Sequence, residues 1–165
     1  MSRARLTWAR NRGSRANIIA NSNPTLLVNL FLEYPRARFD IFHGGYPYGG
    51  ELATLAKNFP NVTINMCWLP VISPAAARRW LDEWLETVPH NKIFAFGGDY
   101  VFVEGAYAHS RIAREVVADV LAAKVESGYL SEDEGLALAP RLLRENAWDF
   151  FRLGERWAGR ATQRH

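Results

Sequence analysis

The sequence has little cysteine, no long apolar run, and no acidic residue before Glu33. The single cysteine, Cys67, excludes an intramolecular disulfide and is typical of a reducing compartment, so we expect a cytoplasmic protein. No apolar run approaches the ~20 residues that a membrane-spanning helix needs. The N-terminus also lacks the apolar middle of a secretory signal. We therefore expect no membrane association.

The positive charge is confined to one end of the chain. Five arginines lie among the first sixteen residues, and beyond them 15 basic residues are outnumbered by 17 acidic ones. The pI of about 9.2 therefore reflects a basic leader. Because no nucleic-acid-binding motif accompanies these arginines, we expect no nucleic-acid partner. The expected organisation is a disordered basic leader at 1–16, a domain at 17–154 and a C-terminal tail at 155–165.

Local signals predict where helices begin and end. Asn23 and Ser73 each precede a proline, the arrangement of an N-cap followed by proline at the first helical position. Ser131 and Glu134 form a capping-box pattern. Pro140 should kink or split the helix that follows. Apolar spacing then predicts helices over 24–34, 51–59, 74–88, 109–126 and 131–153.

Three short segments, 38–42, 62–67 and 92–96, have the apolar content or the alternation of strands. Strands that alternate with helices at this spacing predict right-handed βαβ units and a parallel sheet, an α/β fold. On the outside of the 74–88 helix, two pairs are spaced to interact at i,i+4: Arg78 with Asp82, or Arg79 with Glu83.

Two of the predicted strands end in a polar residue beside a glycine pair. His43 precedes Gly44-Gly45, and Asp99 follows Gly97-Gly98. In parallel sheets, ligands bind beyond the carboxyl ends of the strands, where these two side chains can converge. Imidazole and carboxylate suit Zn²⁺ or an acid/base pair. The alternative is that both residues only cap the strand-end loops.

Other side chains near these loops are candidates for substrate contacts: Tyr46, Tyr48, Tyr100 and Arg111. Loop packing is the alternative for the first two, and a surface ion pair with Glu104 is the alternative for Arg111. Cys67 is expected to be a small buried hydrophobe rather than a nucleophile, because no neighbour would lower its pKa. Asp40 lies within a strand and is either buried with hydrogen-bond partners or exposed to solvent.

Several motifs resemble the C-terminal part of the amidohydrolase-related, metal-dependent hydrolases: NSNP at 21–24, RFDIFHGGYPY at 38–48, NVTINMCW at 61–68, ISP at 72–74, NKIFAFGGDY at 91–100 and NA at 146–147. The resemblance implies a (β/α)₈ TIM barrel of which this chain holds strands 6 to 8. It also implies a divalent metal cofactor, with Zn²⁺ expected. By the same resemblance His43 is a metal ligand, and Asp99 binds the metal and handles the proton of the attacking water.

The chain also departs from that family pattern. The family draws further metal ligands from a His-x-His pair on strand 1 and a histidine on strand 5, but no histidine here precedes His43. A complete barrel needs about 250 residues, against 165 here. We therefore expect an incomplete, truncated barrel with two unpaired sheet edges, and an isolated chain that could lack activity. Its partner would be a complementary barrel fragment or a second copy of the chain.

Three hypotheses about function follow from the resemblance. The first is a metal-dependent hydrolase in which an activated water attacks a carbonyl-like carbon of a small substrate. The second is a non-oxidative decarboxylase on the same scaffold. The third is a catalytically inactive fragment that needs a complementary chain.

Overall fold

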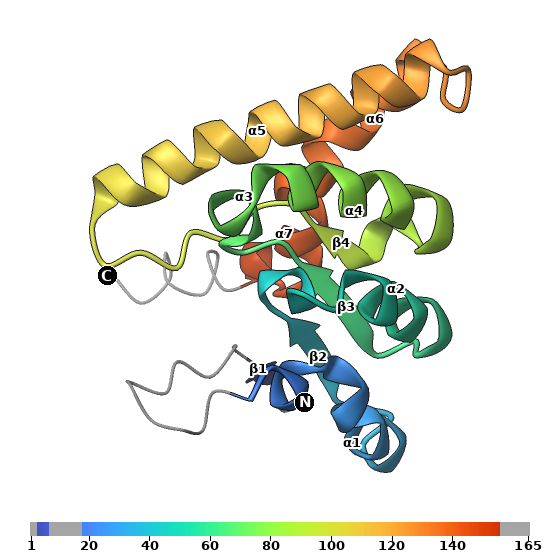
Figure 1. The fold of residues 1–165 in the computed structure, drawn as a ribbon, viewed down its shortest axis with the longest axis vertical. Helices are drawn as coiled ribbons and strands as arrows, with labels where there is room; N and C mark the ends of the chain where they lie inside the picture. The colour runs from blue at the N-terminus through green and yellow to red at the C-terminus, as the bar shows by residue number, and fades with distance from the viewer. Residues whose placement is uncertain (1–2, 7–17, 156–165) are drawn as a thin grey trace.

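Four parallel strands, in the order β1-β2-β3-β4, form the sheet of the computed structural model, which describes residues 3–6 and 18–155 (Figure 1). The strands are β1 Arg3–Leu6, β2 Arg38–Ile41, β3 Val62–Asn65 and β4 Ile93–Phe94. The last three are the predicted strands, so the α/β fold of an incomplete barrel is confirmed. β1 was not predicted. It lies in the expected disordered leader, whose remaining residues fall outside the described ones.

The strand β1 corrects the leader prediction for Arg3–Leu6, because these residues pair in parallel with β2 from Arg3 opposite Arg38 to Leu6 opposite Ile41. The physical reason lies in β2, whose edge offers backbone donors and acceptors to any extended segment beside it. The charge composition of the N-terminal residues does not show that such a strand edge is available to pair with.

Seven α-helices accompany the described part of the sheet: α1 Val28–Glu33, α2 Gly49–Asn58, α3 Leu69–Ile72, α4 Pro74–Thr87, α5 Val103–Glu126, α6 Glu132–Pro140 and α7 Asn146–Phe150. The predicted caps are confirmed. Asn23 accepts from the Thr25 N–H at 2.9 Å, and Ser73 accepts from the Ala76 N–H at 3.1 Å. Ser131 and Glu134 form the reciprocal capping box.

The two C-terminal predictions differ in outcome. Pro140 ends α6, and a π-helical turn at Arg141–Glu145 separates it from α7, so the predicted split is confirmed. The long helix α5 begins at Val103, six residues before the expected start at 109. Figure 1 shows α5 crossing the top of the molecule beside α3 and α4. The early start places residues 103–108 on the helix, while residues 100–102 remain in the loop after Asp99.

The main core lies between the sheet and the helices that cover one of its faces. The strands contribute Phe39, Ile41, Val62, Ile64 and Ile93 to it, and the helices contribute Leu52, Leu81, Trp84 and Val116, among others. Every residue of β3 is buried, as expected for a parallel strand covered on both faces. Trp80 and Trp84 of α4 belong to this core. Trp84 is completely buried, and its indole N–H donates to the Gly49 carbonyl at 3.0 Å.

The opposite face of the sheet is polar beneath β2 and β3 and aromatic beneath β4. The buried Asp40 carboxylate accepts from the Asn65 amide at 3.0 Å and from the Thr63 hydroxyl at 3.3 Å. Of the two alternatives for Asp40, the structure therefore supports the buried, hydrogen-bonded one. Phe94 lies against Phe150 of α7, with ring centroids 5.2 Å apart.

The outer edge of β4 is not open, which corrects the expectation of two unpaired edges. The Ala95 N–H donates to the Leu142 carbonyl at 2.8 Å. The Asn146 amide donates to the carbonyls of His90 at 2.7 Å and Ile93 at 3.0 Å. The chain after Pro140 thus satisfies backbone groups that a further strand would otherwise pair with.

Ion pairs connect α4 to α5 rather than running along α4. Arg78 pairs with Asp119 at 2.7 Å, and Asp82 pairs with Lys124 at 2.9 Å. The predicted Arg78–Asp82 pair is therefore wrong, because each side chain finds a partner on the packed helix. The buried Lys124 also pairs with Glu86. Burial lowers the pKa of Lys124, but the hydrogen bonds and charges of these two carboxylates outweigh it and raise the pKa overall.

Candidate functional site at the carboxyl edge of the sheet

Three residues that follow consecutive strands share an unusual backbone conformation. His43 after β2, Trp68 after β3 and Asp99 after β4 have φ values of 60°, 63° and 46°. For residues other than glycine, this left-handed region costs about 1–2 kcal/mol each. Among the described residues, Arg152 is the other non-glycine residue in that region. Backbone strain is therefore concentrated at the carboxyl edge of the sheet, where parallel folds bind ligands.

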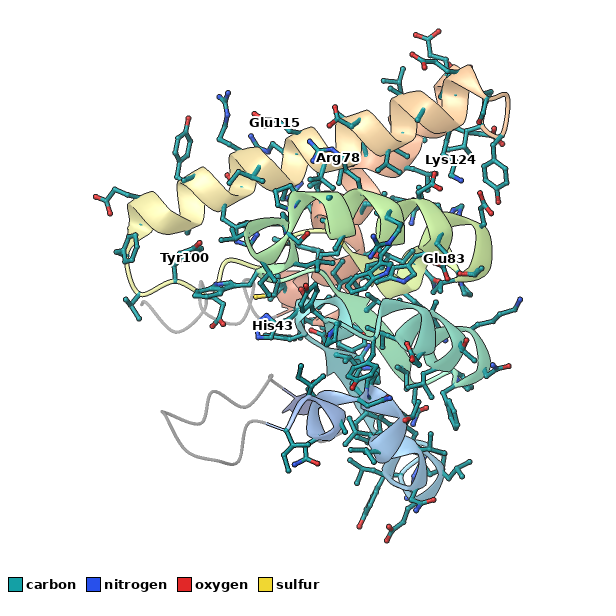
Figure 2. All side chains as sticks on the ribbon, in the orientation of Figure 1. His43, Arg78, Glu83, Tyr100, Glu115 and Lys124 are labelled. Atoms are coloured by element: carbon teal, nitrogen blue, oxygen red, sulfur yellow. The ribbon has the colours of Figure 1, made fainter. Side chains whose placement is uncertain are left out.

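The ring of His43 is buried and fixed in one tautomer. Its Nδ1 lies 2.8 Å from the Cys67 carbonyl. Since a carbonyl only accepts, Nδ1 carries the proton and Nε2 keeps a lone pair, which is the state of a metal-ligating or proton-accepting histidine. The next residue has φ 56°, and a Cβ there would lie 2.6 Å from Leu69, so Gly44 is required for this turn. Figure 2 shows where His43 lies.

Asp99 stands on a loop that is pressed against the end of β3. Its carbonyl accepts a hydrogen bond from the Trp68 indole N–H at 3.2 Å, and its side chain is exposed. A Cβ at Gly97 would lie 2.8 Å from Cys67 and 2.9 Å from Asn65, so the backbone approaches more closely than another residue would allow. His43 is held by Cys67 and Asp99 by Trp68. Two consecutive residues thus bring both predicted site residues to one edge.

An aromatic cluster continues the site beyond Asp99. Tyr100 lies against Trp68 with ring centroids 5.5 Å apart at 31°. On its other side Tyr100 meets the ring of His109 edge-on at 5.8 Å, and Phe96 meets the same ring at 5.5 Å. His109 is almost completely buried. Of the four candidate substrate-contact residues, Tyr100 is the one whose side-chain ring contacts join it to Trp68 and His109.

The side chains of the other candidates have different surroundings, although the Tyr46 N–H donates to the His43 carbonyl at 3.0 Å. Tyr46 lies against Trp80 of α4 at 5.6 Å, in keeping with the loop-packing alternative. Tyr48 is half-buried just before α2, and Arg111 is exposed on α5. Their contact with a substrate stays a prediction.

Two site residues were missed from the sequence: Trp68 and Asn65. Trp68 had a usable signal, since it directly follows the predicted strand 62–67 as His43 directly follows the predicted strand 38–42. Asn65 had a weaker one, a polar position in a strand whose apolar and polar residues alternate. The sequence placed His109 at the expected start of the helix after Asp99, among residues that could face a substrate; the structure buries it on α5, which begins earlier.

The side chains of His43 and Asp99 meet only part of what a divalent metal ion requires. Imidazole and carboxylate are suitable donors for a divalent ion, and His43 presents a free Nε2. Within residues 3–6 and 18–155, however, no three His, Cys, Asp or Glu side chains come together in a way that could hold one. Catalytic zinc ordinarily has three protein ligands. The described residues fit a metal in donor type and fall short in donor number.

Within the same residues, none of the helices has the length and apolar character needed to cross a membrane.

The sequence model of the family described as amidohydrolase matches residues 12–153. Protein fluG of Emericella nidulans is 28% identical over 138 residues, which cover 83% of this chain and 16% of that protein.

Among solved structures, a protein from Lactobacillus casei ATCC 334, described as a metal-dependent hydrolase, superimposes with a TM-score of 0.66 at 20% identity. The match covers 81% of this chain and 35% of that one. The likeness shows a shared fold. The chain spans about a third of the solved structure and a sixth of the curated relative.

Proposed function

Because the chain belongs to the amidohydrolase family, we propose that its carboxyl edge serves in hydrolysis, with water attacking a carbonyl-like carbon of a small molecule. The observation that carries the proposal is the left-handed backbone shared by His43, Trp68 and Asp99. Strained backbone of this kind persists only where the surrounding structure enforces it, and it is found mostly at active sites. Here the strained residues come after three neighbouring strands. His43 and Asp99, an imidazole and a carboxylate, stand at two of these three strand ends.

Asp99 is the proposed acid/base group. Its exposed carboxylate can accept a proton from water and then deliver it to the leaving group, while its backbone is held through the carbonyl. His43 is held differently, because the hydrogen bond at Nδ1 leaves only Nε2 to act. The two residues thus combine a fixed lone pair with an accessible carboxylate.

A divalent ion, Zn²⁺ by donor chemistry, is the cofactor we propose for this site. When bound, such an ion polarises the carbonyl and lowers the pKa of water. His43 and Asp99 would supply two of its ligands. Since the described residues bring no third donor near, further donors must join them. The description of the Lactobacillus casei protein as metal-dependent supports this choice.

Tyr100 and Trp68 supply an aromatic wall beside Asp99, and we propose that a small substrate lies against it. Tyr48 and Arg111 are proposed at its periphery. The buried thiol of Cys67 suits a reducing compartment, which supports a cytoplasmic location.

Zinc binding tests the proposal directly. The purified chain is dialysed against Zn²⁺ and analysed for bound metal, alongside His43→Ala, Asp99→Ala and His90→Ala. His90 is the matched control because its Nε2 bonds to the Leu85 carbonyl, away from the site. We expect weak zinc binding that both site substitutions abolish and the control retains.

Zinc that binds equally to all four proteins, or to none, would contradict the proposal. Where zinc binds, small amides and esters are screened for hydrolysis and carboxylated aromatics for CO₂ release. Release of CO₂ without hydrolysis would replace the hydrolase with the decarboxylase.

A further inference from the structure

Asn65, the last residue of β3, has a buried side chain whose two polar ends both have partners. Its Nδ2–H donates to the Asp40 carboxylate at 3.0 Å, and its Oδ1 accepts the Cys67 N–H at 2.9 Å. Because a backbone N–H can only donate, the amide oxygen must face Cys67, and the amide nitrogen is left to face Asp40. The orientation of the Asn65 amide is therefore fixed.

Cys67 connects Asn65 to His43. Its N–H donates to Asn65, and its carbonyl accepts the Nδ1–H of His43 at 2.8 Å. The N–H and the carbonyl of one residue are attached to the same Cα, so a bond that holds the first restricts the direction of the second. Three hydrogen bonds thus lead from the His43 imidazole to the Asp40 carboxylate, and all four residues are buried. Burial strengthens such a chain of bonds.

An asparagine is an unusual choice for this position. Asparagine is depleted in strands, and a parallel strand covered on both faces is normally apolar. Burying an amide costs free energy that its hydrogen bonds at best offset, whereas a leucine of similar volume would not incur that cost. What the amide adds is direction, because a fully bonded polar network specifies one arrangement of its members.

The backbone after β4 packs against the same two residues. A Cβ at Gly97 would lie 2.9 Å from the Asn65 Oδ1 and 2.8 Å from the Cys67 Cβ. Gly97 therefore approaches them more closely than another residue could, and it limits how far the Asn65 amide can move.

We propose that Asn65 is a positioning residue for His43. Held by Asp40, its amide fixes the backbone of Cys67, whose carbonyl keeps the ring proton of His43 on Nδ1 and leaves Nε2 as the nitrogen that can bind a metal or accept a proton. The catalytic meaning of this arrangement rests on the proposed function, in which His43 acts through Nε2. Its effect on the His43 ring does not.

The test observes the ring of His43 without metal or substrate. Spectra that correlate ring nitrogens with ring C–H protons distinguish the two tautomers, and they are recorded at about pH 8.5, where imidazole is neutral. Amide hydrogen exchange of Cys67 is measured on the same samples. Asn65→Leu removes both hydrogen bonds at similar volume. It should populate both tautomers, where the wild type shows only Nδ1–H, and accelerate Cys67 exchange roughly fivefold, as expected for one lost hydrogen bond.

Two further variants separate hydrogen bonding from packing. In the double variant Asp40→Asn with Asn65→Asp, amide and carboxylate exchange places, so the Cys67 N–H again meets an oxygen and the pair keeps one negative charge. This variant should show the single tautomer and slow exchange. Thr63→Val is the matched control, because the Thr63 hydroxyl lies within hydrogen-bond distance of Asp40 and of the Phe39 carbonyl. It should leave His43 and Cys67 unchanged.

A folded Asn65→Leu protein that keeps only the Nδ1–H tautomer would overturn the proposal. A Thr63→Val protein that changes the ring as much as Asn65→Leu would also overturn it. Where Asn65→Leu does not fold, the double variant decides, since loss of the single tautomer there contradicts the role of the hydrogen bonds. These outcomes are independent of zinc. A chain that binds no zinc but shows the expected tautomers loses the proposed function and keeps the positioning role of Asn65.

Discussion

Two regions of the molecule differ in whether their buried polar groups have partners. One is the interface between α4 and α5, and the other is the carboxyl edge of the sheet. At the interface, the buried Lys124 meets two carboxylates. At the edge, the ring nitrogens of the buried His109 have no hydrogen-bond partner within the described residues, and neighbouring backbone is strained. Figure 2 shows Lys124 and Glu83 on the right of the view, Tyr100 on the left, and His43 between them. One region is built for stability, and the other gives up stability where chemistry is expected.

The largest effect should come from the core that supports both regions. Trp84 is completely buried between α4 and the sheet, and its ring lies where a Cβ of Gly44 would be 2.9 Å away. Trp84→Ala should lower the free energy of unfolding by about 4 kcal/mol, because it leaves a large cavity. Urea unfolding measures it, with Trp84→Phe as the milder control. A loss below about 1 kcal/mol would mean that the two regions do not depend on this core.

At the interface between α4 and α5, Lys124→Met should lower the free energy of unfolding by about 2 kcal/mol. The reason is that two half-exposed carboxylates lose their partner. Because the pKa of Lys124 is raised on folding, its contribution is complete below the ordinary pKa of 10.5 and disappears as pH rises through the folded value. Urea unfolding between pH 7 and pH 11 tests both points. Lys57→Met, at an exposed lysine, is the matched control. An equal loss of unfolding free energy in this control would mean that the two carboxylates do not give Lys124 a special role.

At the carboxyl edge of the sheet, replacing the buried His109 should stabilise the fold instead of destabilising it. His109→Phe should raise the free energy of unfolding by about 1 kcal/mol at neutral pH. Burial lowers the pKa of His109 below 6.5, so the unfolded chain takes up a proton first as pH falls. Wild-type stability should therefore drop from pH 7 toward pH 5, and the variant should drop less. Parallel pH profiles for the two proteins would argue against this.

Backbone strain at the edge is testable at Asp99. Asp99→Gly should stabilise the fold by about 0.5 kcal/mol, since glycine adopts a positive φ without steric cost. It should also abolish any zinc binding. Arg152→Gly relieves the same kind of strain away from the site and should stabilise the fold without affecting zinc. Destabilisation by Asp99→Gly would mean that the backbone there is not strained.

The smallest effect is expected at an exposed cap outside both regions. Hydrogen bonds from Ser131 lower the pKa of Glu134, so its contribution is present above the ordinary value of 4.5 and is lost as pH falls through the folded value. Glu134→Ala should lower the melting temperature slightly at pH 7 and not at pH 3. Glu132→Ala, on the same first turn, serves as the control.

Local chemistry allowed much of the fold to be predicted. The N-caps at Asn23 and Ser73, the capping box and the break after Pro140 depend on neighbours within a few residues, and all of them formed. The partner of Arg78 did not follow from its own helix, because α5 brings Asp119 closer than the i,i+4 geometry brings Asp82.

The candidate site divides in the same way. His43 and Asp99 were predicted from strand ends and glycine pairs, and the structure brings them to one edge through Cys67 and Trp68. The role of Trp68 depends on a hydrogen bond across 31 residues, which no local pattern encodes.

The sequence by itself determined the order of β2, β3 and β4 and of the longer helices, their caps and breaks, and the residue types at the ends of β2 and β4, because these depend on periodicity and on near neighbours. Only the tertiary structure decided that the edge of β4 is covered and that Lys124 of α5 forms ion pairs with carboxylates of α4. It also decided that His109 is buried beside the loop that carries Asp99. Each of these joins segments far apart in the chain. Their contacts arise from packing, which a local pattern does not contain.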